Sequence, residues 1–185
     1  MRIEETKDGK ASVWMQEEAE AKSFKSSRLI GEEVKSKTSK DSRLIREEVK
    51  LRASKEFDVR FSEVDSMNIV WHGAYPLYFE DAREEFGRIY GLSYQLFRFC
   101  ECPAPLVELY FRYVKPLLYG QRARVEVAYR NTPAAKIIFD YEIRLTVDDS
   151  LVTTGRSTQV FIDKNNDLLL TNPPFYEAWK KKYNL

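Results

Sequence analysis

The chain has 185 residues, with 30 lysines and arginines against 29 aspartates and glutamates and a formal net charge of +1. This length fits one domain with an appendage rather than several large domains. The near-neutral charge provides no broad positive field for nucleic acid or an anionic membrane, and no apolar run is long enough to cross a bilayer, so we expect a soluble globular protein.

The first 54 residues differ in composition from the rest of the chain. They carry 24 charged side chains but only two aromatic residues, Trp14 and Phe24, whereas the remaining aromatic residues and all seven prolines follow Lys55. We therefore predict a charged N-terminal extension over residues 1–54 and a folded domain over residues 55–185.

The extension contains a repeat of fifteen residues. Residues 27–40 match residues 42–55 at ten of fourteen positions, and each copy has serine before paired glutamates and lysine after them. This charge order suits a helix, but the apolar stripe, Leu44, Ile45 and Val49 in the second copy, is narrow. The extension is therefore either a docking or oligomerisation arm, or a solvated segment.

The folded domain begins with a strand and a long helix. Phe57, Val59 and Phe61 alternate with polar residues, which predicts a half-buried strand. From Ala74 to Tyr90 the apolar residues recur every three or four positions, with Pro76 in the first turn and Gly91 at the end.

Four further strands are predicted over residues 105–115, 122–131, 136–147 and 151–163, followed by a short helix over residues 175–183. Because no helix separates the later strands, the sheet should be antiparallel, with the long helix laid across it. The predicted fold class is α+β.

The junction between the first strand and the long helix carries the residues best suited to chemistry. Asp65 lies on the loop that leaves the strand, and His72, the only histidine, lies where the helix begins. The first amides of a helix lack internal acceptors and stabilise a carbonyl oxygen placed there, while a nearby carboxylate can attack the carbonyl carbon or activate water. The structural alternative is that Asp65 only forms a turn and His72 only packs.

The segment that carries this junction also resembles a known family. It reads Asp65-Ser-Met-Asn68-Ile-Val70-Trp-His72-Gly-Ala-Tyr75 and continues Tyr78-Phe79-Glu80-Asp-Ala82-Arg83. This run resembles the hot-dog-fold acyl-CoA thioesterases of the 4-hydroxybenzoyl-CoA thioesterase type and their YbgC-like branch, as does the later run from Tyr113 to Gly120. The resemblance covers roughly residues 55 to 165.

The resemblance implies an antiparallel sheet wrapped around one long helix and hydrolysis of acyl-CoA thioesters to free acid and CoA. Asp65 would be the nucleophile or general base, and the backbone amide of His72 or a neighbour would polarise the thioester carbonyl. The His72 side chain would orient water, and Asn68, Ile69, Val70 and Tyr75 would line the substrate site.

The chain departs from the family pattern at two positions. The family's glycine is Asn68 here, and asparagine tolerates the positive φ that such a position requires; Phe61 replaces a tyrosine that often lies four residues before the aspartate. Two other functions stay open: an acyl-carrier-protein thioesterase, and a non-catalytic module that binds acyl-CoA.

Cofactors, location and assembly complete these expectations. One histidine and two cysteines, Cys100 and Cys102, give little material for a metal site, and the resemblance implies no cofactor. The charged first residues are unlike a secretory signal, which predicts a cytoplasmic protein. The resemblance further implies a homodimer, or a dimer of dimers, with each active site at a subunit boundary.

Overall fold

A computed structural model describes residues 51–185, and the predicted helical repeats of the extension lie outside the described residues. The elements follow in the order β1 (Arg52–Asp58), η1 (Phe61–Glu63), η2 (His72–Ala74), α2 (Tyr75–Tyr90), α3 (Tyr94–Phe99), β2 (Leu106–Tyr113), β3 (Arg122–Arg130), β4 (Lys136–Leu145), β5 (Leu151–Val160) and α4 (Pro174–Lys182). No helix among the described residues is both long and apolar enough to span a membrane.

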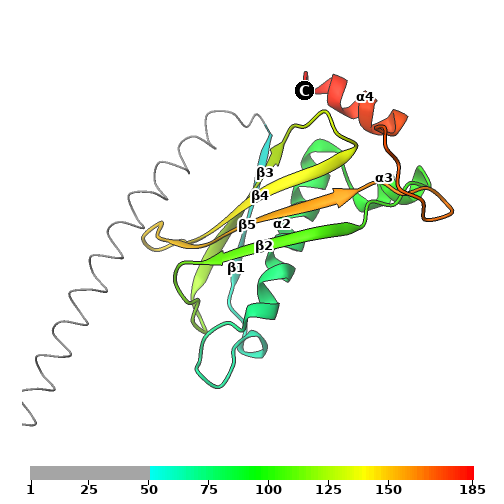
Figure 1. Ribbon diagram of the computed structural model, residues 1–185. Helices are drawn as coiled ribbons and strands as arrows, with labels where there is room; N and C mark the ends of the chain where they lie inside the picture. Colours follow the sequence, from blue (N-terminus) through cyan, green and yellow to red (C-terminus); the bar gives the residue numbers. More distant parts are fainter. Residues whose placement is uncertain (1–50) are drawn as a thin grey trace, which may run out of the picture. The chain divides into compact units, whose positions relative to one another are not determined.

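The five strands form one antiparallel sheet in the order β1-β3-β4-β5-β2. Figure 1 shows α2 lying across one face of this sheet. The predicted antiparallel sheet, the long helix and the four later strands are confirmed.

The core lies between α2 and the inner face of the sheet. Phe79, Ala82 and Phe86 recur on one side of α2 and are fully buried, as the three- and four-residue spacing predicts. The ring of Phe79 stacks on Tyr141 of β4 at 4.1 Å. Gly155 of β5 makes this approach possible, because a Cβ there would lie 2.4 Å from the Phe79 ring.

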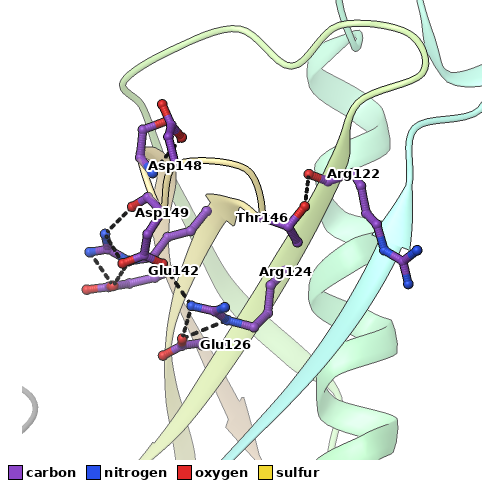
Figure 2. Close-up of polar contacts among 9 residues, drawn as sticks. Arg122, Arg124, Glu126, Glu142, Thr146, Asp148 and Asp149 are labelled. Atoms are coloured by element: carbon purple, nitrogen blue, oxygen red, sulfur yellow. Dashed lines mark hydrogen bonds and ion pairs between the residues drawn. The ribbon is translucent and has the colours of Figure 1, made fainter.

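The outer face of the sheet carries ion pairs between neighbouring strands. Arg124 and Arg144 are directly opposite each other on β3 and β4, and Asp149 from the β4–β5 turn contacts both, at 2.9 and 3.7 Å (Figure 2). Each arginine also pairs with a glutamate of its own strand, Arg124 with Glu126 and Arg144 with Glu142. The turn carboxylate thus bridges two like charges that would otherwise repel.

The first strand differs from its prediction. It runs from Arg52 to Asp58 and does not include Phe61, which begins the short helix η1 and is 77% exposed. The chain leaves the sheet here because the Glu63 carboxylate accepts the Arg60 amide, at 2.8 Å, and closes a helical turn. The alternation of apolar residues therefore continued past the end of the strand.

Candidate active site

The loop between β1 and α2 folds back on itself around Asp65. The Asp65 amide donates to the Ile69 carbonyl at 2.9 Å, and the Asn68 amide donates to the Asp65 carbonyl at 2.9 Å. Val64 and Val70 form a β-bridge on either side of this turn. Asn68 has φ 60°, so this position does take the positive φ that asparagine tolerates.

The Asp65 carboxylate is held by one of its two oxygens. Oδ1 accepts the Met67 amide at 2.8 Å. Within residues 51–185 no donor contacts Oδ2. One oxygen thus fixes the side chain while the other remains available to a ligand.

The same turn occurs a second time in the chain, at Asp163. The Asp163 amide donates to the Asp167 carbonyl, and the Asn166 amide donates to the Asp163 carbonyl. The Asp163 side chain accepts the Asn165 amide through Oδ1 at 2.8 Å. Asn166 has φ 66° and Ile162 bridges to Leu168. An aspartate in this kind of turn therefore has a structural role whether or not it is catalytic. Any functional difference between Asp65 and Asp163 must come from the residues around them.

The stretch that begins the long helix carries two backbone amides with no acceptor among residues 51–185. The Trp71 amide donates to the Glu63 carbonyl at 3.0 Å, and the Ala74 amide donates to the Trp71 carbonyl at 3.0 Å. In the described part of the chain, the amides of His72 and Gly73 have no such acceptor. A Cβ at Gly73 would lie 2.0 Å from the Trp71 ring, so a larger residue here would require this half-exposed ring to move.

Asp65 and the start of the helix lie in one cleft of about 370 Å³. Its lining residues come from the loop, the helix start and the segment after β2: Asp65, Met67, Ile69, Val70, Trp71, His72, Tyr75, Tyr113, Val114, Lys115 and Pro116. The structure therefore brings together five of the six residues proposed from the sequence. Asn68 shapes the turn but is not among the lining residues.

The segment after β2 contributes residues that the sequence analysis did not assign to the site. Tyr113 ends β2, and Lys115 supplies a positive charge to the cleft. The Val70 amide donates to the Leu117 carbonyl at 2.8 Å, which fastens this segment to the Asp65 loop. The sequence did indicate this segment, through the family-like run from Tyr113 to Gly120. It did not indicate that the run lies beside the helix start, because that depends on the order of the strands in the sheet.

Two phenols, a buried one and a half-exposed one, line the cleft. Tyr75 and Tyr113 pack edge to face at 4.9 Å, and the Tyr113 hydroxyl donates to the His72 carbonyl at 3.4 Å. Burial raises the pKa of both phenols above the ordinary value. They are therefore neutral hydrogen-bonding groups in the neutral pH range.

Phe61, which replaces a family tyrosine, lies outside this cleft. Its ring contacts Tyr119 edge to face at 5.7 Å, and it is not among the lining residues. Nor does the described part of the chain gather three His, Cys, Asp or Glu side chains as a metal site. The chemistry available in the cleft comes from Asp65, the helix-start amides, His72, Lys115 and the two phenols.

Comparison with known proteins places this cleft in a family. A sequence model of the thioesterase-like superfamily matches residues 59–180. The chain belongs to the thioesterase-like superfamily. The match includes the Asp65 turn, the helix start and the segment after β2.

Two named proteins resemble the chain along most of their own length. YneP of Bacillus subtilis (strain 168), provisionally named an acyl-CoA thioesterase, is 28% identical over 69% of this chain and 92% of its own length. A provisionally named esterase of Aquifex aeolicus (strain VF5) is 35% identical over 60% of this chain and 84% of its own length.

A solved thioesterase structure also superposes on the chain. The DHNA-CoA thioesterase of Staphylococcus aureus has a TM-score of 0.64 and 24% identity, covering 73% of this chain and 93% of its own. The predicted hot-dog fold, an antiparallel sheet wrapped around one long helix, is thereby confirmed.

Proposed function

We propose that this protein hydrolyses acyl thioesters of coenzyme A in the cleft of Asp65. The observation that carries the proposal is the shared cleft. Asp65, whose carboxylate has one free oxygen, and His72, whose amide has no acceptor among the described residues, line the same space, and Gly73 follows His72 directly. Membership of the thioesterase-like superfamily supports the reaction class.

The thioester carbonyl oxygen would accept hydrogen bonds from the amides of His72 and Gly73, which stabilise the negative charge that develops there. Asp65 Oδ2 then acts on the carbonyl carbon in one of two ways. It attacks directly, expelling the CoA thiolate and leaving an acyl-aspartyl anhydride that water cleaves, or it takes a proton from an attacking water. Both routes consume one water and release a free acid and a thiol.

The other proposed site residues would position the substrate. Ile69, Val70 and Tyr75 would contact the acyl group, while Asn68 would act indirectly by shaping the turn. The His72 side chain would orient the attacking water. Lys115 would attract the anionic CoA moiety, since it adds a positive charge to the cleft.

The proposal is tested by Asp65→Asn, with thiol release measured on a panel of acyl-CoA thioesters. Asparagine keeps an oxygen for the Met67 amide but can neither attack nor accept the proton, so we expect kcat to fall by about 10²–10⁴-fold. Asp163→Asn is the matched control, because it makes the same change in the same kind of turn, outside the cleft.

Turnover by Asp65→Asn close to that of Asp163→Asn would overturn the assignment. Thermal stabilisation by acyl-CoA without thiol release would instead support a non-catalytic binding module. Faster cleavage of carrier-bound than of CoA-bound chains would identify an acyl-carrier-protein thioesterase.

We further propose that two chains pair through β2. Among the described strands, β2 ends the sheet and bonds only to β5. It carries the exposed residues Leu106, Val107, Tyr110 and Tyr113. An exposed apolar edge strand invites pairing with another strand. Since Tyr113 both ends β2 and lines the cleft, a partner at this edge would lie beside the active site.

A further inference from the structure

The buried carboxylate of Glu63 lies beside the candidate site but takes no part in the chemistry proposed for it. Glu63 ends η1, two residues before Asp65, and is only 9% exposed. It is not among the residues that line the cleft. A buried charge is costly unless it is hydrogen-bonded, so the hydrogen-bond partners of this carboxylate must explain why it is tolerated in a buried position.

The side chain of Glu63 joins the loop to the first turns of the long helix. Its Oε2 accepts the Tyr78 hydroxyl at 2.8 Å and the Arg60 amide at 2.8 Å. The Tyr78 ring stacks on Phe57 of β1 at 4.0 Å. Burial, and then the hydrogen bond to Glu63, raise the pKa of the Tyr78 phenol, so this hydroxyl remains a proton donor to the carboxylate.

The backbone of Glu63 holds the other end of the same loop. Its carbonyl accepts the Trp71 amide at 3.0 Å, directly before His72. The Asp65 turn lies between these two attachments and is closed by the bridge from Val64 to Val70. One residue therefore fixes both the segment that carries Asp65 and the segment that presents the helix-start amides.

We propose that Glu63, through its hydrogen bond to Tyr78, is a positioning residue that sets Asp65 against the amides of His72 and Gly73. This inference rests on the proposed thioester hydrolysis. A displacement of about 1 Å between reacting groups can reduce turnover by about 10²-fold. A hydroxyl and a carboxylate that never touch the substrate thereby control the rate.

Tyr78→Phe tests this link, because it removes one hydroxyl and leaves the stacked ring. Tyr90→Phe is the matched control: Tyr90 lies at the far end of α2 and its hydroxyl donates to the Arg52 carbonyl at 2.8 Å. Both variants should lower the melting temperature. Only Tyr78→Phe should lower kcat, by about tenfold, with KM changed less than about twofold.

Variants of Glu63 separate positioning from a general loss of packing. Glu63→Gln keeps an oxygen that can accept both donors and should retain kcat within about threefold of wild type, whereas Glu63→Leu should lower it by about tenfold or more. In Glu63→Leu, adding Tyr78→Phe should cause little further loss, because both changes break the same bond.

Amide hydrogen exchange over residues 64–71 supplies a readout that needs no substrate. Exchange should accelerate in Tyr78→Phe and Glu63→Leu but not in Tyr90→Phe or Glu63→Gln. Unchanged exchange, or equal kcat in Tyr78→Phe and Tyr90→Phe, would overturn the positioning role. If the wild-type protein cleaves no thioester, the proposed function fails, and the exchange pattern alone decides whether Glu63 orders the loop.

Discussion

Asn68 shows how one residue sets the shape of the Asp65 turn. It occupies the left-handed region at φ 60°, as Asn166 does at φ 66° in the corresponding turn after β5. Left-handed backbone excludes most side chains, and asparagine is among the few that tolerate it. The substitution of the family's glycine by asparagine therefore preserves the turn.

We predict that Asn68→Gly keeps turnover and stability close to wild type. Asn68→Val should destabilise the fold by about 1–2 kcal/mol, because a β-branched side chain clashes in this conformation. Denaturant unfolding and thiol release check both variants.

The matched control for this prediction is Asn166→Val. It should cost similar stability but leave turnover unchanged, since its turn lies outside the cleft. Equal turnover in Asn68→Val and Asn166→Val would contradict a role for the Asp65 turn in catalysis.

Single-residue patterns predicted part of the site. Asp65 and Tyr75 are only ten residues apart, on one loop and the helix start that follows it, so a local sequence motif could indicate this half of the site. Tyr113 and Lys115 reach the same cleft because the connection from β2 to β3 runs past the Asp65 loop, where the Val70 amide bonds to Leu117 and Ile69 bridges to Leu118. Glu63 was missed because a buried acidic residue on a loop has no periodic signal.

At the scale of elements, periodic patterns located the long helix and the later strands. Arg122–Arg130 and Lys136–Leu145 alternate buried and less buried residues along most of their lengths. The six-residue helix α3 was not predicted, because it is too short for a helical period to stand out. Two residues after its end at Phe99, Glu101 has φ 49°, and the next amide, of Cys102, bonds back to the Phe97 carbonyl.

The β4–β5 turn gives a prediction at this scale. Asp149→Asn keeps a residue that tolerates the left-handed φ of 54° but removes the charge between Arg124 and Arg144 (Figure 2). We expect the free energy of unfolding to fall by about 1 kcal/mol. The difference from wild type should shrink in about 1 M salt, where charges are screened.

Asp148→Asn is the control for this turn. Asp148 accepts the Ser150 amide at 3.0 Å, and asparagine can still do so. An equal loss of stability in Asp148→Asn and Asp149→Asn would show that the bridge between the two arginines contributes nothing.

At the scale of the whole molecule, we predict a homodimer. Light scattering after size-exclusion chromatography should give twice the 21.8 kDa of one chain, or a multiple of that pair. Val107→Lys should shift this mass toward the monomer, because a charge at an edge strand opposes pairing, and should lower kcat if the partner completes the cleft.

Val147→Lys is the control for the same change in side chain. Val147 is 85% exposed on the β4–β5 turn, away from the β2 edge. A stable wild-type monomer, or equal masses for the two variants, would contradict pairing through β2.

The ion pairs on the outer face of the sheet have a consequence for substrate capture. Arg124, Arg130, Arg144 and Arg156 are matched by Glu126, Asp140, Glu142 and Asp149. Since these charges cancel at short range, this face contributes little long-range attraction for a polyanion such as coenzyme A. In the proposed reaction, the attraction for this polyanion would therefore have to come from cations at the cleft itself, such as Lys115.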